Sequence, residues 1–297
     1  MMKGQKQGMA NTTALKRRIT SVKNTKQITK AMELVAASKM RRAQDNAFKS
    51  RDFTNLAQTL LSRLRELTDV TKHPLFEQRQ AVKTRLHLAV TSDRGLAGAY
   101  NSNVLRELAK ELKADEDQNV KSEVMVVGKQ AARFIAKFDN IEVKNVYSNF
   151  PEHPTPNDIK PILDIIIERF TKKEVDLVDI LYTDFKSSIS QVVKYERLLP
   201  AAFTEMPISH DLELAEFEPS PKKVLDSVTT RLIEAQLSQA FLESQASEHS
   251  MRMMAMKNAT DNASDIVDDL TLEFNTARQA SITQELAEIT GGAEAIK

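Results

Sequence analysis

The 297-residue chain contains no Cys and no Trp, and only nine Pro and seven Gly. The absence of Cys excludes disulfides, thiolate chemistry and Cys-ligated metal sites. No apolar run approaches the ~18–20 residues that a membrane-spanning helix needs. Lys and Arg total 42 against 41 Asp and Glu, so the net charge indicates no polyanionic partner. Residues 1–10 form a polar N-terminal extension without the apolar core of a signal peptide, which predicts a cytosol-facing protein.

Residues 222–290 lack both proline and glycine, which predicts one long helix. Ser220 suits the N-cap and Pro221 the first helical position, whereas Gly291-Gly292 predicts a helix stop. At 1.5 Å per residue this helix would be roughly 100 Å long, so it needs a partner helix. Apolar or small residues recur four and three apart, the period of a coiled coil. They are Met253, Met256, Thr260, Ala263, Val267, Leu270, Phe274, Ala277 and Ser281.

The N-terminal part of the chain predicts the partner helix. It would begin at one of Asn11, Thr12 or Thr13 and end near Asp69, before His73-Pro74. Apolar stripes comprise Leu15, Ile19, Val22, Ile28, Met32 and Val35, and then Phe53, Leu56, Leu60, Leu64 and Leu67. Residues 15–42 carry nine Lys or Arg against one acidic residue, whereas residues 265–297 carry seven acidic residues against two basic ones. Opposite charges favour association of the two helices, although exposed ion pairs are individually weak.

The middle of the chain alternates short apolar runs with helical stretches. The expected strands are 86–91, 123–127, 141–147, 177–185 and 189–198, and the expected helices are 102–112, 129–138 and 157–171. Strand–helix alternation predicts a mostly parallel sheet covered by helices, and the turn at residues 186–188 predicts a final antiparallel hairpin.

The predicted fold class is therefore an α/β domain inserted between two long terminal helices that pair as an antiparallel coiled coil. The expected divisions are the extension (1–10), an N-terminal shaft helix (11–70), the α/β domain (71–219) and a C-terminal shaft helix (220–297). Antiparallel pairing is the simplest way for the helices to bury both apolar seams.

The stretch from Ser92 to Asn101 is the strongest enzyme candidate, because it follows a predicted strand and precedes a helix. Its two glycines match neither the dinucleotide-binding nor the P-loop pattern. We favour a tight turn in which Asp93 and Arg94 hydrogen-bond locally or face a partner. The five histidines lack metal-ligand spacing; His87 is expected to be packed or at a sheet edge, and His249 to set helix register or meet a partner. We predict no catalytic, cofactor-binding or metal-binding residue.

Motifs at both ends and in the middle of the chain resemble one family over the full length, the gamma subunit of the F-type ATP synthase. The matching segments are Ile19–Thr25, Ile28–Lys39, Ser92–Leu96, Ser247–His249, Arg252, Met256–Ala263, Asn275–Glu285 and Gly291–Ala293. Their order and spacing make the resemblance specific.

The resemblance implies a rotor shaft that turns inside a ring of three alpha and three beta subunits. Its α/β foot would sit on the membrane c-ring and the epsilon subunit, and ion flow would drive rotation. The catalytic sites belong to the beta subunits, so the isolated chain is expected to be no enzyme and to need no cofactor. The chain is expected neither to bind nucleic acid nor to span a membrane.

The resemblance also implies contact and coupling residues. Met32 corresponds to a position where the shaft meets the moving beta segment, and Arg252, Gln279 and Thr283 to positions of coupling and beta contact. We add Lys23, Lys26 and Lys30 as a basic face suited to acidic beta segments. Solvation, or pairing with the acidic C-terminal helix, is the alternative role for these lysines.

The chain departs from the plant-chloroplast form of the family, because without Cys it cannot use thiol control. Its N-terminus does not resemble a transit peptide, which favours a bacterial protein at the cytoplasmic face of the inner membrane. Two other functions stay open: a nucleotide-binding α/β enzyme that uses residues 92–101, and a coiled-coil scaffold or nucleic-acid binder that uses the basic first helix. The enzyme predicts bound nucleotide, and the nucleic-acid binder predicts salt-sensitive binding.

Overall fold

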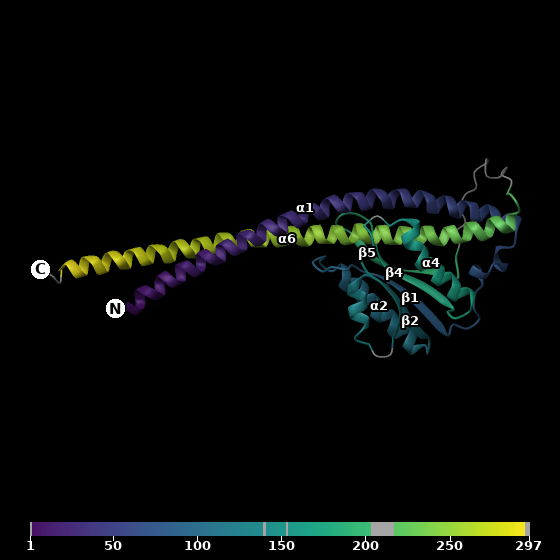
Figure 1. Cartoon of the computed structure of the whole chain (residues 1–297), viewed down its shortest axis with the longest axis horizontal. Helices are drawn as coiled ribbons and strands as arrows, with labels where there is room; N and C mark the ends of the chain where they lie inside the picture. The colour runs from purple at the N-terminus through teal and green to yellow at the C-terminus, as the bar shows by residue number, and fades with distance from the viewer. Residues whose placement is uncertain (1, 139–140, 153, 203–216, 295–297) are drawn as a thin grey trace. The chain divides into compact units, whose positions relative to one another are not determined.

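The computed structural model describes residues 2–138, 141–152, 154–202 and 217–294. Helix α1 (Met2–Leu67) and helix α6 (Pro221–Glu294) come first and last in the chain (Figure 1). The chain divides into two compact units. Residues 1–35 and 253–297 form the terminal unit, and residues 36–252 form the central unit.

The central unit contains a five-stranded sheet with the order β3-β2-β1-β4-β5. The strands β1 (Thr84–Val90), β2 (Lys121–Val127), β3 (Glu142–Tyr147) and β4 (Leu177–Phe185) are parallel, and β5 (Gln191–Leu199) is antiparallel to β4. Parallel strands covered on both faces consist of near-continuous apolar runs, and β4 is buried along its whole length. The predicted parallel sheet with an antiparallel edge is confirmed.

Helices cover both faces of this sheet (Figure 1). Helices α2 (Tyr100–Asp117) and α3 (Lys129–Ile135) pack on one face. Helix α4 (Pro156–Thr171) packs on the other face, together with the second part of α1 and the first part of α6. Two 3₁₀ turns, η1 (Val70–Lys72) and η2 (Pro74–Phe76), follow α1. The sequence pattern placed these strands and helices within a few residues of their observed ends, except for the C-terminal end of α2, and did not indicate the 3₁₀ turns.

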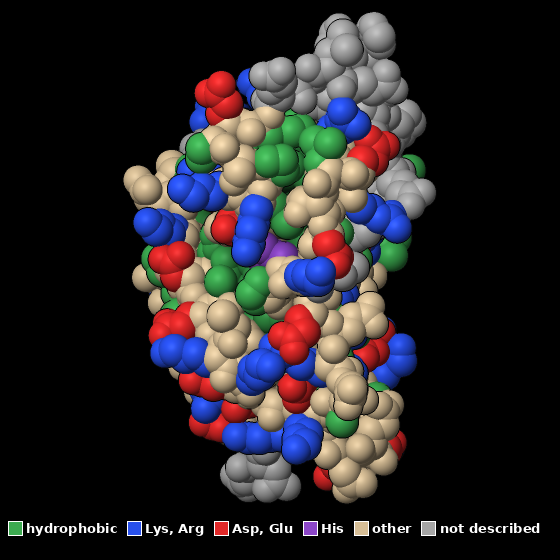
Figure 2. Space-filling model, turned by 90° about the vertical axis from the view of Figure 1, so that its right-hand side faces the viewer, with side chains coloured by type: hydrophobic (Ala, Val, Ile, Leu, Met, Phe, Trp, Pro, Cys, Tyr) green, Lys and Arg blue, Asp and Glu red, His purple; other side chains and the backbone are tan. Residues whose placement is uncertain are grey.

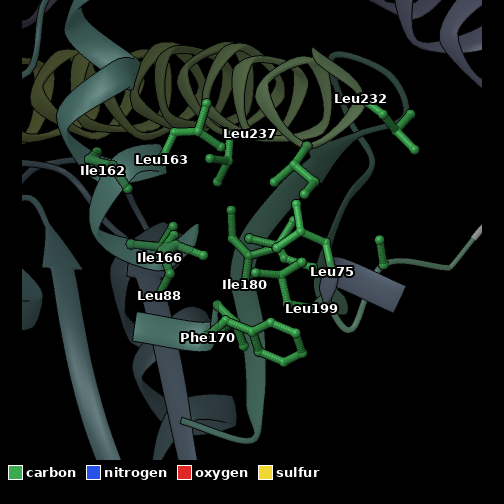
Figure 3. Close-up of a cluster of buried hydrophobic side chains, with 14 of the residues drawn as sticks. Leu75, Leu88, Ile162, Leu163, Ile166, Phe170, Ile180, Leu199, Leu232 and Leu237 are labelled. Atoms are coloured by element: carbon green, nitrogen blue, oxygen red, sulfur yellow. The ribbon is translucent and has the colours of Figure 1, made fainter. Parts of the chain in front are cut away.

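The larger hydrophobic core lies between the sheet and α4 and α6 (Figure 3). Leu88 and Ile180 from the sheet, Ile166 from α4 and Leu237 from α6 are almost completely buried. Each such side chain contributes about 1.5–3 kcal/mol through its removal from water. This packing attaches the first part of α6 to the α/β fold.

The second apolar stripe of α1 is only partly the one that the sequence predicts. Leu56 and Leu67 are exposed and Leu60 is half-buried, so the prediction is wrong for the first two. The buried positions are Ala57, Leu61 and Leu64. Leu60 and Leu61 are adjacent, so this helix has apolar residues on two neighbouring faces, and only tertiary packing selects the one that enters the core. The side chain of Phe53 lies outside the described residues.

In the terminal unit, the first part of α1 and the last part of α6 run side by side in opposite directions (Figure 1). The predicted seam of α6 is confirmed, because all nine of its positions are buried or half-buried. Thr260 of α6 donates a hydrogen bond to Thr29 of α1 over 2.8 Å, and both side chains are buried. Among the described residues of this unit, no ion pair joins the basic residues of α1 to the acidic residues of α6. The two helices of this unit are therefore held together by the packing of the seam residues and not by ion pairs between them.

On α1 the seam differs from the predicted stripe. Ile28 and Val35 are 61% and 55% exposed, so their assignment to the seam is wrong. The spacing of four and three continues from Val22 through Lys26, which is half-buried, and Thr29, which is buried. The spacing of the coiled coil thus decides which residues of α1 enter the seam, even where these are polar. Ile28 and Val35 do not fit that spacing and are exposed.

Both long helices extend beyond their predicted ends. Helix α1 begins at Met2 instead of Asn11–Thr13, and α6 continues through Gly291-Gly292 to Glu294. Glycine inside a helix costs only about 1 kcal/mol relative to alanine, so it does not end a helix by itself. The start of α6 at Pro221 is confirmed, and the Val224 N–H donates to the Ser220 carbonyl over 3.1 Å.

Candidate partner-contact site

The polar groups of the loop from Ser92 to Asn101 hydrogen-bond both within the loop and to two neighbouring segments of the chain. The Asp93 carboxylate accepts hydrogen bonds from the backbone N–H groups of Lys129 (3.1 Å) and Asn149 (2.8 Å). The Asn101 side chain accepts a bond from the Ser92 N–H over 3.0 Å. The bond between Ser92 and Asn101 supports the interpretation of the loop as a turn. Local hydrogen bonding is not what Asp93 shows, because its carboxylate joins the loop to the segments that follow β2 and β3.

Helix α6 covers the place where an open α/β sheet binds ligands, outside the strand ends where the strand order reverses, here between β1 and β4. The hydroxyls of Tyr100 and Ser244 hydrogen-bond over 2.7 Å, and Ser247 donates to the Thr183 carbonyl over 3.0 Å. A cavity of about 50 Å³ remains between α6 and the carboxyl ends of β1 and β2, space for one or two water molecules. Within the part of the chain that the structure describes, no group of three or more His, Asp or Glu side chains could hold a metal ion.

Arg252 connects α6 to this loop inside the central unit. Its guanidinium lies 2.6 Å from the Glu248 carboxylate, one turn earlier on α6, and 3.4 Å from the Gly95 carbonyl. Burial raises the pKa of Glu248, and the charge of Arg252 opposes this shift. The resemblance pointed to Arg252, but no sequence signal indicated its contact with a loop that precedes it by 157 residues.

Two buried histidines have structural roles. His249 is buried, which together with the charges of Arg252 and Lys39 lowers its pKa to about 4, so it is neutral near pH 7. His87 is completely buried, and its Nε2 lies 2.8 Å from the Asp115 carboxylate. The prediction that His87 is a packed residue is confirmed.

In the terminal unit, Met32 is half-buried on α1. Three exposed apolar residues surround it in the sequence: Ile28, Leu34 and Val35. Lys23 and Lys30 are exposed and Lys26 is half-buried; Lys30 pairs with Glu33 on the same helix over 2.9 Å. This part of α1 therefore presents apolar and basic groups together.

Gln279 and Thr283 are both exposed near the end of α6, where the Thr283 hydroxyl donates to the Gln279 carbonyl over 3.0 Å. Beside them, Ile282, Leu286 and Ile289 are 46%, 58% and 68% exposed. At helical spacing these three share a face with Gln279. This exposed apolar face was not predicted from the sequence. The pattern that could have indicated it is the spacing of four and three between Ile282, Leu286 and Ile289, which lie outside the seam.

Basic and acidic groups are intermixed on the face of the molecule that Figure 2 shows. Figure 2 shows Lys and Arg side chains interspersed with Asp and Glu side chains on one face of the molecule, with small groups of apolar side chains between them. No helix among the described residues is long and apolar enough to cross a membrane. The face shown in Figure 2 thus suits contact with other proteins better than binding to a polyanion.

An α/β domain between two long antiparallel helices, with its ligand crevice covered and apolar residues exposed along the helices, defines a structural protein that binds partners. The family model for ATP synthase matches residues 11–296. ATP synthase gamma chains from Stenotrophomonas maltophilia and Exiguobacterium sibiricum are 37% and 41% identical to this chain. Each alignment covers 97% of this chain, and 100% and 99% of the respective relative. The chain belongs to the ATP synthase gamma chain family.

Solved structures show the same fold. A chain from the central stalk and c-ring of the Tetrahymena thermophila mitochondrial ATP synthase matches with a TM-score of 0.61 and 25% identity. This match covers 78% of the present chain and 99% of the other. A chain from the Euglena gracilis mitochondrial ATP synthase matches with a TM-score of 0.65 and 18% identity, over 97% of this chain and 95% of the other.

Proposed function

We propose that this chain is the rotor shaft of an F-type ATP synthase and couples ion flow through a membrane ring to ATP synthesis or hydrolysis on beta subunits. The observation that carries this proposal is the match to ATP synthase gamma chains over 97% of the chain. The covered crevice, and the hydrogen bonds that already engage Tyr100 and Asp93 within the chain, favour it over a nucleotide-binding enzyme.

The proposed partners are three alpha and three beta subunits, the epsilon subunit and the c-ring. Helices α1 and α6 form the shaft, within the divisions 11–70 and 220–297 expected from the sequence, and the α/β division of residues 71–219 is the foot. The chain has no catalytic residue; rotation changes which beta subunit each face of the shaft contacts, and so shifts the equilibria of the catalytic sites. We place the complex at the cytoplasmic face of a bacterial inner membrane, with this chain peripheral to it.

The proposed contact and coupling residues are Met32, Lys23, Lys26, Lys30, Arg252, Gln279 and Thr283. Exposed apolar groups beside Met32 and Gln279 support this assignment, because contiguous exposed apolar residues mark protein interfaces. Arg252 differs from the others, since it already contacts Glu248 and the Gly95 carbonyl within the chain. We assign it the role of fixing α6 against the loop.

The function is tested by mixing matched alpha and beta subunits with and without this chain, and by measuring complex size and ATP hydrolysis. We expect one copy of the chain to enter a stable complex with three copies of each partner and to raise turnover strongly. If well-folded components give neither a complex nor a change in turnover, the proposal is wrong. Nucleotide binding by the isolated chain would then favour the enzyme alternative.

A second experiment tests the contact residues. The double substitution Gln279→Ala and Thr283→Ala is expected to lower turnover of the assembled complex about fivefold or more, the lower range of coupling between sites. The matched control is Thr271→Ala, because Thr271 is also exposed and donates its hydroxyl to the carbonyl four residues earlier. It lies about 120° around the helix from Thr283. Equal turnover in both variants would contradict the assignment.

A further inference from the structure

Two buried carboxyl groups meet where α6 packs on the sheet in the central unit. Asp184 lies near the end of β4 and Glu243 lies on α6, and their side chains are only 1% and 2% exposed. A single guanidinium group, that of Arg51 on α1, reaches both. Its Nη2 lies 2.8 Å from Glu243 Oε1 and 3.9 Å from Asp184 Oδ1. The carboxyl groups of Asp184 and Glu243 are therefore both close to the positive charge of the Arg51 guanidinium.

The hydrogen bonds around the pair are incomplete if both acids are ionised. Glu243 Oε1 accepts bonds from Arg51 Nε and from Gln239 Nε2, each at 3.0 Å. Glu243 Oε2 and Asp184 Oδ1 are both buried without a hydrogen-bond donor. A buried acceptor without a donor destabilises the folded state. One proton held between the two carboxyl groups would supply the missing donor.

The charges around the pair agree with one neutral and one ionised carboxyl. Asp184 Oδ2 faces the ammonium groups of Lys186 at 2.6 Å and Lys194 at 3.3 Å. Burial raises the pKa of Glu243, and the nearby charge of Asp184 raises it further, against the opposing effect of Arg51. Burial also raises the pKa of Asp184, but the contacts with Lys186 and Lys194 outweigh it and leave that pKa lowered.

Two further titratable groups face the pair from the sheet. Glu196 on β5 pairs with Lys194 over 3.1 Å and accepts a bond from the Tyr182 hydroxyl over 3.0 Å. Glu196 is about half exposed and so reaches water, whereas Asp184 and Glu243 do not.

We propose that Asp184 and Glu243 share one proton, and that this proton fastens α6 to the sheet as a pH-sensitive contact. At the pH where the proton leaves, two adjacent carboxylates remain buried with no donor between them. They repel each other, and the contact between α6 and β4 is weakened.

The direction of the pH effect on stability follows from the pKa shifts of Glu243 and Asp184, which are opposite in sign. Since the pKa of Glu243 is raised on folding, its contribution to stability is complete below its ordinary value of 4.5 and is lost as the pH rises through the folded pKa. The lowered pKa of Asp184 acts in the opposite direction: its contribution is present above 3.8 and is lost in acid. Of these two acids, only Glu243 should lose its contribution to stability above about pH 5.

The substitution Glu243→Gln tests this proposal in the full-length chain. A Gln side chain can donate its amide to Asp184 and accept from Arg51 at every pH. We expect the thermal midpoint of the wild type to fall relative to that of the variant by about 3 °C or more as the pH rises from 5 to 9. The control, Glu234→Gln, changes an acid on the same helix that pairs with Arg231 over 2.6 Å, and should show no such trend. Parallel pH profiles for the wild type and Glu243→Gln would overturn the proposal.

Infrared spectroscopy of the wild type provides a second test that does not depend on the folding of a variant. The carbonyl stretch of a protonated carboxyl group should be present near pH 7 and disappear at high pH. Burial also raises the pKa of Glu248, so the test is the part of the band that belongs to the pair. In Asp184→Asn the new amide donates to Glu243, so the band near neutral pH should be weaker than in the wild type, whereas in Glu234→Gln it should keep its full intensity. Equal intensity in the wild type and Asp184→Asn would contradict the proposal. Absence of the band from the wild type at pH 7 would refute the shared proton.

Discussion

Replacing Gly128 by Ala is expected to lower the free energy of unfolding of the α/β fold by about 4 kcal/mol or more. Gly128 has a φ of +95°, and a Cβ atom there would lie 2.2 Å from the carbonyl oxygen of Thr91. Thr91 cannot easily move, because its N–H donates to the Val127 carbonyl over 2.8 Å and its hydroxyl accepts from the Ala131 N–H over 3.0 Å. Chemical denaturation of the full-length chain measures the loss.

Gly95→Ala is the matched control for this prediction. A Cβ atom at Gly95 would meet no heavy atom within 4 Å, and the residue is exposed in the loop that follows β1. We expect a change within about 0.5 kcal/mol, as for most surface substitutions. Similar losses at both glycines would show that the close approach of Gly128 to Thr91 is not what constrains the fold.

Replacing Leu270 by Asp is expected to separate the two helices of the terminal unit. Leu270 is 5% exposed in the seam of α6, so the substitution removes apolar contact and places an unpaired charge against α1. A large-to-small change and an uncompensated buried charge each cost about 3–5 kcal/mol. The loss should appear as reduced helical content by circular dichroism and as early melting of this unit.

Leu272→Asp separates the effect of burial from the effect of the new charge. Leu272 is 70% exposed and lies two residues further along α6, on a different face. The isolated chain should therefore keep its helical content and its melting profile after this substitution. Equal damage at Leu270 and Leu272 would contradict the antiparallel seam.

Local sequence patterns predicted the strands, the parallel sheet and the seam of α6, because these features depend on periodicity along the chain. Strand β4 was placed at Leu177–Phe185, as observed, since its run of apolar residues is bounded by turn-forming ones. The seam of α6 could be read from residue spacing alone. In both cases one short-range pattern agrees with the tertiary packing.

Features that depend on which other part of the chain packs against a helix or strand could not be predicted from local sequence patterns. The apolar stripe of α1 was assigned in part to the wrong face, because Leu56 and Leu61 are equally apolar and only packing buries Leu61. The ends of the long helices were misplaced because glycine only weakly opposes a helix.

Most of the candidate site was also beyond local prediction. The resemblance to a family pointed to Met32, Arg252, Gln279 and Thr283, and no spacing in the chain would have selected them. The pairing of Asp184 with Glu243 joins residues that are 59 positions apart, and their charge types alone would have predicted repulsion. The contact of Arg252 with the Gly95 carbonyl likewise needs the folded structure.

The position of α6 over the carboxyl ends of the strands has a consequence for the evolution of control in this protein. Phe241 and Ser244, which line the small cavity that remains there, belong to the helix that extends into the terminal unit. A metabolite of nucleotide size could enter only by displacing that helix, so small-molecule sensing at the crevice and mechanical attachment there are mutually exclusive. In this fold α6 occupies the place where open α/β sheets bind their ligands. Signals that act on this region must therefore act on the helix itself.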